Sequence, residues 1–327
     1  MTGYPWQPGA ATGIGSLPGT DLGEALRIVF GELPLPYLPE LPARGPGADL
    51  VGRTAGLLVD FPVQLYAGRW QVADRAGRDL RRTADLRERD LDALTDHADG
   101  YAGPLKVSAA GPWTLAAALQ LPLGGPLLGD PGAVRELTES LAEGLSLHVR
   151  EVARRVPGAR VLLQLDEPSL PAVLAGRVPT ESGLRTLRSV ADPVARDRLR
   201  LLVESVGVPV VVHCCAQDVP VALLHEAGAA GVALDLSLGP ALDPLGEALD
   251  AGLGLFAGAF PAVGPPPPAA SVAATVTDLW YKIGLPADRL AAQVVVTPSC
   301  GQAGATPTDT RAALRTCREA ARRILDA

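Results

Sequence analysis

The stretch at residues 208–215 reads VPVVVHCC, a run of valines that ends in His213, Cys214 and Cys215. A short apolar run that is rich in β-branched residues and bounded by turn residues is typical of a buried strand. A similar run, VLLQLDEPSL at residues 161–170, comes before it, and a segment with helical spacing of apolar residues lies between the two. Two buried strands joined by a helix predict a parallel pair with a crossover connection.

The same alternation continues in both directions along the chain, and no shift in composition marks a domain boundary. Eight strand-helix units favour a closed barrel over an open sheet. The sequence therefore predicts an α/β protein, a (β/α)8 TIM barrel that forms a single domain over residues 1–327. The expected strands are residues 11–15, 36–40, 106–110, 160–166, 208–214, 231–236, 252–258 and 293–298. The expected helices are residues 22–30, 48–67, 86–98, 131–155, 181–206, 219–227, 244–251, 269–283 and 307–325.

The composition excludes several classes of protein. The 327 residues include 36 glycines and 31 prolines, and 47% are apolar, so the chain can bury a full core. Acidic residues outnumber basic ones by 36 to 29, and the net charge of −7 does not favour a nucleic-acid partner. The most apolar segment, residues 105–129, is interrupted by prolines before it reaches the length of a membrane span. Without a basic and apolar leader, the sequence predicts a cytoplasmic protein that binds neither membrane nor nucleic acid.

Polar side chains end six of the expected strands. In a (β/α)8 barrel the carboxyl ends of the strands meet at one rim, and active sites lie there. The sequence therefore predicts one site at that rim. Its candidate residues are Ser16, Glu40, Asp166 with Glu167, His213 to Cys215, Asp235 and Cys300.

An imidazole and two thiols in this set are potential metal ligands. Side chains alternate along a strand, so His213 and Cys215 lie on one side and Cys214 lies on the other. Together with Cys300, at another strand end, they offer three of the four groups of a tetrahedral zinc site. Buried cysteines and a lone histidine are also common in ordinary cores. Three such residues at strand ends favour zinc, with Cys214 and Cys317 as core residues.

Two carboxylates and a serine complete the predicted site. Asp166 precedes Pro168 at a strand end, a position suited to binding a ligand amine or to general base catalysis, and equally to an ordinary turn. Glu40 allows the same interpretations. Ser16 lies in the loop GIGSLPG, whose backbone N–H groups are suited to an anion such as a carboxylate. The chain has no phosphate-binding glycine motif and no GxSxG motif.

Six short motifs lie along the chain in a defined order. They are GIGS at residues 13–16, PELPAR at 39–44 with Glu40 and Arg44, AAGPWTL at 109–115, LDEPSL at 165–170, VVHCC at 211–215 and TPSCG at 297–301. This ordered set resembles the catalytic barrel of cobalamin-independent methionine synthases, in the short form with one barrel. The resemblance covers essentially the whole chain.

The resemblance also implies roles for the candidate residues. It implies a zinc ion bound by His213, Cys215 and Cys300. It implies that Asp166 and Glu40 are the catalytic carboxylates that bind the amine of homocysteine. The carboxylate of homocysteine is then expected near the backbone of the loop GIGS.

Three features depart from the longer members of that family. Those members have a second, N-terminal barrel that helps to bind folate, whereas this chain is expected to form one barrel. Their fourth zinc ligand is a glutamate at the end of strand six, where this sequence has Asp235, one methylene shorter. Their loop after strand seven carries an aspartate and a histidine, and the histidine is assigned to protonate the leaving pterin. Here residues 255–263 read LFAGAFPAV, with Ala257, Ala259 and Phe260.

Sequence and resemblance together predict a zinc-dependent methyltransferase that transfers a methyl group to the thiol of homocysteine or of a related small molecule, in methionine synthesis. The candidate methyl donors are methylcobalamin, a corrinoid protein and methyltetrahydrofolate, and the missing proton donor favours the corrinoids. One alternative is a protein that binds zinc or thiols without turnover. Another is a metal-free barrel related to uroporphyrinogen decarboxylase.

Overall fold

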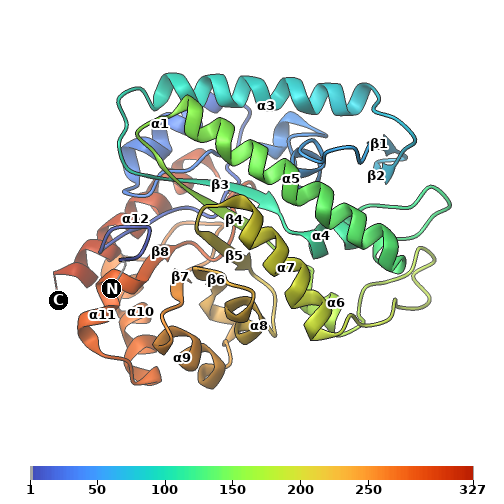
Figure 1. Ribbon diagram of the computed structural model, residues 1–327. Coiled ribbons are helices and arrows are strands. Elements are labelled where there is room, and N and C mark those ends of the chain that lie inside the picture. Colours follow the sequence, from blue (N-terminus) through green and yellow to red (C-terminus); the bar gives the residue numbers. More distant parts are fainter. Residues whose placement is uncertain (1–2, 327) are drawn as a thin grey trace.

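The structure is a computed structural model that describes residues 3–326 (Figure 1). At its centre six parallel strands pair in the order in which they occur along the chain. They are β3 (Pro104–Ala110), β4 (Arg160–Asp166), β5 (Val210–Cys214), β6 (Gly231–Asp235), β7 (Gly254–Gly258) and β8 (Val294–Thr297). These strands match the last six expected ones, and the predicted α/β barrel architecture is confirmed.

Two extended N-terminal segments close the ring between β8 and β3. The first two expected strands, residues 11–15 and 36–40, occupy these positions, but they form isolated parallel bridges rather than full ladders. Pro36 and Pro39 have no N–H to donate, which shortens the hydrogen-bonding pattern of the second segment. The bridges pair Ala11 with Val296, Ser16 with Glu40, and Tyr37 with Lys106.

Helices surround this ring, and α5 packs against α7 along one side (Figure 1). They are α1 (Leu22–Glu32), α2 (Leu50–Ala55), α3 (Arg78–His97), α4 (Pro112–Ala118), α5 (Pro131–Arg155), α6 (Leu170–Leu174), α7 (Asp192–Val206), α8 (Val221–Glu226), α9 (Leu242–Asp250), α10 (Ala269–Ile283), α11 (Ala287–Gln293) and α12 (Pro307–Leu325). Short 3-10 helices are η1 (Pro42–Arg44), η2 (Leu127–Gly129) and η3 (Leu236–Leu238). Among the described residues, no helix combines the length and the apolar character needed to cross a bilayer.

Three helices begin and end where the sequence predicts, because their ends carry clear signals. α5 follows Asp130, whose carboxylate accepts from the backbone N–H groups of Gly132 and Ala133, and a proline occupies its first turn. α12 begins after Thr306, whose hydroxyl accepts from the N–H of Asp309. The third, α10, follows the polyproline run and ends at a glycine with positive φ.

Two expected helices are wrong over part of their length. In the range 48–67 only α2 is helical, and the chain then forms an antiparallel hairpin of β1 (Val63–Tyr66) and β2 (Arg69–Val72). Its turn uses Ala67 and Gly68, both with positive φ, so a helix cannot continue there. In the range 181–206 the helix begins only at α7, because the chain first forms a turn in which Gly183 has positive φ and Pro179 bridges to Thr186.

A cluster of apolar side chains lies inside the ring, around Trp6. Trp6 is buried there, its ring meets the Phe256 ring edge to face at 4.9 Å, and its indole N–H donates to the Ala292 carbonyl at 3.1 Å. Trp6 also lies against Gly231 and Gly254, the first residues of β6 and β7. The N-terminal end of the barrel is therefore plugged by an aromatic side chain, and polar residues gather at the other end.

Candidate metal and substrate site

The carboxyl ends of the strands enclose one pocket of about 230 Å³. Of the candidate residues, the pocket brings together Ser16, Glu40, Asp166, His213, Cys215 and Cys300, whereas Glu167, Cys214 and Asp235 do not line it. Those that line it come from the N-terminal segments, from β4 and β5, and from the loop after β8. The lining residues are Ile14, Gly15, Ser16, Glu40, Pro42, Leu50, Asp166, Pro168, His213, Cys215, Cys300 and Gly301.

His213, Cys215 and Cys300 form a compact group in this pocket. Each contributes one potential ligand atom, and these atoms all lie within 4.8 Å of one another. The two sulfurs are 3.3 Å apart. Two Zn–S bonds of about 2.3 Å at a tetrahedral angle would separate the sulfurs by about 3.8 Å, so only a small adjustment is needed. Cys214 and Cys317 are buried elsewhere and do not belong to the group.

The His213 ring is held in the orientation that a metal ligand needs. Its Nδ1 lies 2.8 Å from Asp166 Oδ1, and its buried Nε2 has no hydrogen-bond partner among the described residues. Metal-binding histidines commonly donate one ring N–H to a carboxylate, and the other nitrogen binds the metal. An unpartnered buried nitrogen beside two sulfurs fits a tetrahedral metal with nitrogen and sulfur ligands.

The same three groups shift one another's protonation. Burial alone would lower the pKa of His213, but its hydrogen bond to Asp166 and the neighbouring Cys300 sulfur raise that pKa to about 9. The contact with Cys215, aided by His213, lowers the pKa of Cys300 to about 4. The same contact with Cys300, together with burial, raises the pKa of Cys215. The cluster thus holds one sulfur as a thiolate, the form that binds metal.

Asp235 lies outside this group. Its carboxylate caps η3, accepting from the Ser237 backbone N–H at 2.9 Å and from the Ser237 hydroxyl at 2.6 Å. It lines a separate hollow with Gln217 and Asp218. The strand register would place it beside Cys215, but the structure directs its carboxylate to the cap instead.

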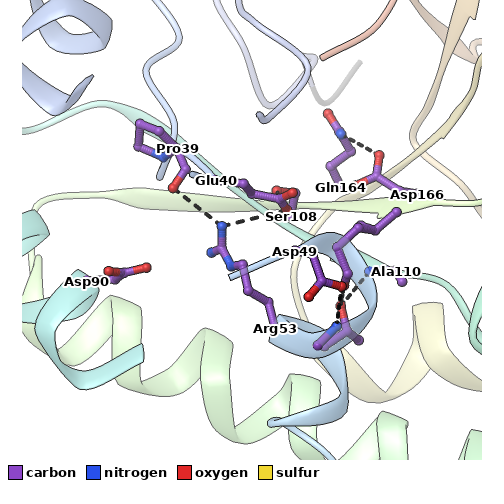
Figure 2. Close-up of polar contacts among 12 residues, drawn as sticks. Pro39, Glu40, Asp49, Arg53, Asp90, Ser108, Ala110, Gln164 and Asp166 are labelled. Atoms are coloured by element: carbon purple, nitrogen blue, oxygen red, sulfur yellow. Dashed lines mark hydrogen bonds and ion pairs between the residues drawn. The ribbon is translucent and has the colours of Figure 1, made fainter. Parts of the chain in front are cut away.

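Glu40 also lines the pocket, and polar contacts with neighbouring side chains anchor it (Figure 2). Its Oε1 accepts from the Ser108 hydroxyl at 3.0 Å and lies 3.7 Å from a guanidinium nitrogen of Arg53. Burial raises the pKa of Glu40, while Arg53 opposes this shift. Arg53 also donates to the Pro39 carbonyl at 3.4 Å. Glu40 is therefore a fixed, buried carboxylate rather than a mobile loop residue.

Asp166 has a role that the sequence does not reveal. Its Oδ1 accepts from His213 Nδ1 and also from Gln164 Nε2, at 2.7 Å. It therefore supports a metal-capable histidine while also lining the pocket. One sequence pattern could have indicated which residues contact Asp166: polar residues recur at every second position of otherwise apolar strands. Lys106 and Ser108 alternate along β3, and Gln164 and Asp166 alternate along β4.

Glu167, the next residue, has a structural role. Its carboxylate accepts from the backbone N–H groups of Trp113 and Thr114 and from the Thr114 hydroxyl, at 2.8 to 3.0 Å. Burial raises the pKa of Glu167 to about 7, although these hydrogen bonds oppose the shift. The glutamate thus joins the end of β4 to the start of α4, and with them the motifs LDEPSL and AAGPWTL.

Two further motif residues shape the rim. Arg44 forms a bidentate pair with Asp90 of α3 at 2.6 and 2.8 Å, so it fixes η1 instead of facing the pocket. Ser16 fills the space in which a side chain at Gly301 would lie, which explains a glycine at that position. The Ser16 carbonyl accepts from the Gln302 N–H at 2.7 Å and ties the GIGS loop to the loop after β8.

Fold and site together define an α/β barrel with a His-Cys-Cys group, in which the histidine is buried and the cysteines are partly exposed, and two buried carboxylates at the carboxyl ends of its strands. Residues 9–323 match the family model described as cobalamin-independent synthase, catalytic domain. The chain belongs to this family, as the sequence motifs predict. No protein with a curated description matches the sequence.

One of the solved structures similar to this chain supports the architecture. A B12-independent methionine synthase from Shewanella sp. W3-18-1, in complex with selenomethionine, superposes with a TM-score of 0.64 and 13% identity, covering 99% of this chain and 98% of that one. A morphinone reductase mutant in complex with tetrahydroNAD gives a TM-score of 0.43 at 11% identity, over 90% of this chain and 80% of that one. The first similarity supports the fold, and the second is too low to support any further argument.

Proposed function

We propose that this protein is a zinc-dependent methyltransferase that methylates the thiol of homocysteine or of a closely related small molecule. The observation that carries the proposal is the unpartnered Nε2 of His213 beside two cysteine sulfurs, in a pocket that also contains two buried carboxylates. Membership of the cobalamin-independent synthase family supports the reaction class.

His213, Cys215 and Cys300 would hold the zinc ion. Three protein ligands leave one position open, which is the usual arrangement of a catalytic zinc site. When bound there, zinc would keep an alkyl thiol ionised at neutral pH, which makes the sulfur a strong nucleophile. The proposed role of Asp235 as a fourth ligand depends on its leaving the Ser237 cap. With that cap in place, we expect Asp235→Ala to keep its zinc, and loss of zinc in that variant would add Asp235 to the ligands.

The protein groups would select and orient the amino-acid end of the substrate. Glu40 and Asp166 line the pocket as carboxylates suited to an ammonium group. The GIGS loop, with Ser16, is proposed to bind the substrate carboxylate through backbone N–H groups. The pocket volume suits a small amino acid, and the Shewanella relative was solved with selenomethionine. Asp166 would also keep the proton of His213 on Nδ1, which leaves Nε2 free for the metal.

The cellular setting follows from the thiols. The four cysteines are free in the described chain, and two of them must remain reduced to bind metal. We propose a reducing, cytoplasmic compartment for this activity.

Metal analysis followed by an activity assay tests the proposal. Protein purified without added metal should contain zinc, and it should form methionine from homocysteine when supplied with methylcobalamin, a methylated corrinoid protein or methyltetrahydrofolate. Zinc without turnover with any donor would favour a protein that only binds zinc or thiols. Absence of zinc, with no binding when zinc is added, would favour the metal-free decarboxylase-like alternative.

A further inference from the structure

A charged lysine is buried inside the barrel, beneath the pocket. Lys106 lies in the middle of β3 with no exposed surface, and its ammonium group sits 4.9 Å from the centre of the Tyr37 ring. It donates to the Ile14 carbonyl at 2.8 Å and to Gln164 Oε1 at 2.6 Å. Burial lowers the pKa of Lys106 to about 8, although nearby carboxylates raise it, so the group is mainly cationic at pH 7. A buried charge of this kind requires a reason.

The lysine fixes the orientation of the Gln164 amide. An ammonium group has only donors, so the amide must present its oxygen to Lys106 and its nitrogen to the other side. Gln164 Nε2 accordingly donates to the Ile14 carbonyl at 2.8 Å. It also donates to Asp166 Oδ1 at 2.7 Å (Figure 2). The same Asp166 oxygen receives the His213 ring at 2.8 Å.

We propose that Lys106 and Gln164 are positioning residues for the metal site, which act through Asp166 on the His213 ring. This inference rests on the proposed zinc site. With Gln164 fixed as a donor, Asp166 Oδ1 stays an acceptor and holds the histidine proton on Nδ1. Nε2 is then the ring nitrogen that is left to face the sulfurs of Cys215 and Cys300 and to bind the metal. The order of contacts is therefore lysine, glutamine, aspartate, histidine, metal.

A purely structural role for these residues would have a different consequence. Lys106 also lies close enough to Asp166 and Glu40 for their charges to raise its pKa, and it could serve only to balance those two carboxylates. In that case loss of the Gln164 donor would lower stability and leave metal affinity unchanged. Metal affinity measured beside stability separates the two roles.

The test uses two substitutions of one residue and a matched control. Gln164→Leu removes both the oxygen that accepts from Lys106 and the N–H that donates to Asp166. Gln164→Glu keeps an acceptor for Lys106 and a side chain of the same size, but it adds a carboxylate and removes the N–H that Asp166 receives. The added negative charge by itself would favour a cation, so weaker zinc binding in this variant cannot come from the charge. Gln293→Leu removes another fully buried glutamine, which bonds to the Leu249 and Leu253 carbonyls at the N-terminal end of β8 and away from the pocket.

We expect both Gln164 variants to bind zinc about tenfold more weakly than the wild type in a chelator competition assay, the lower end of the loss typical for partners of metal-binding histidines. Gln293→Leu should have a lower thermal midpoint and wild-type zinc affinity. Wild-type affinity in Gln164→Glu would overturn the positioning role, even if Gln164→Leu fails to fold. A wild-type protein that binds no zinc would overturn the metal site itself and this inference with it.

Discussion

At the scale of single residues, the two proposed ligand sulfurs differ from the other thiols in their surroundings. Cys215 and Cys300 face the pocket, whereas Cys214 is fully buried and burial raises its pKa to about 12. We expect about one zinc per chain, with most of it lost in Cys215→Ser or Cys300→Ser and retained in Cys214→Ser. Metal analysis of the purified variants measures this. Full zinc content in both ligand variants would end the zinc assignment.

The two pocket carboxylates should differ in their effects. Glu40→Gln should weaken homocysteine binding about ten- to hundredfold with zinc affinity unchanged, because an ammonium loses a charge-assisted partner. Asp166→Asn should weaken both, since Asp166 contacts His213 as well as the pocket. Titration calorimetry with homocysteine and chelator competition for zinc separate these effects. Unchanged zinc affinity in Asp166→Asn would show that the contact with His213 does not matter for the metal.

At the scale of elements, Glu167 joins β4 to α4 through three accepted hydrogen bonds. In Glu167→Gln an amide N–H would face a backbone N–H, so we expect the free energy of unfolding to fall by about 2 to 3 kcal/mol. Glu24→Gln, in an exposed ion pair with Arg27, should change it by less than about 0.5 kcal/mol. Urea unfolding of both variants tests this, and equal losses would remove the special role of Glu167.

The helices and strands differ in how well the sequence predicts them. Helices with a cap and a proline in the first turn, such as α5 and α12, could be predicted because their limits are local. The hairpin β1–β2 could not, because residues 48–67 carry apolar spacing that fits more than one conformation until Ala67 and Gly68 adopt positive φ.

For the candidate site, the sequence predicts which residues lie at the strand ends, but it does not predict which of their side chains meet. Strand ends locate Glu40, Asp166 and His213 at one rim once the barrel order is known. The pairing of Lys106 with Gln164 depends on contacts between strands, and spacing along one strand does not reveal which side chains meet. The strand pattern likewise does not predict whether the Asp235 carboxylate faces the pocket or caps η3, as it does here.

At the scale of the whole molecule, the N-terminal segment both closes the ring and plugs it. Trp6 is buried within the barrel, and Ala11 bridges to β8. Trp6→Ala should therefore lower the free energy of unfolding by about 3 to 5 kcal/mol, with zinc content retained because the metal site is at the other end. Trp6→Ala with wild-type stability would show that the plug is dispensable.

That the chain forms a single domain remains a prediction, and one cooperative unfolding transition would support it.

The residues of β7 and of the segment that follows it bear on the choice of methyl donor. Residues 255–263, LFAGAFPAV, contain no titratable side chain. Backbone contacts hold this segment in place: the Ala259 N–H donates to the Thr297 carbonyl at 3.1 Å, and the Phe260 carbonyl accepts from the Ser299 N–H at 2.9 Å. Demethylation of methyltetrahydrofolate leaves a nitrogen anion unless that nitrogen is protonated. A positioned acid typically contributes about 10² to 10⁴ in rate, and this segment has none to offer.

A methyl group on corrinoid cobalt leaves without a proton, because cobalt keeps the electron pair of the broken bond. We therefore expect methylcobalamin or a methylated corrinoid protein to support faster methylation of homocysteine than methyltetrahydrofolate, with or without several glutamates on the folate. Methionine formation with each donor measures this. The Cys300→Ser variant supplies the background rate of a barrel that lacks one zinc ligand. Robust turnover with the folate and none with either corrinoid would overturn the prediction, and a proton donor would then have to come from another loop of the rim.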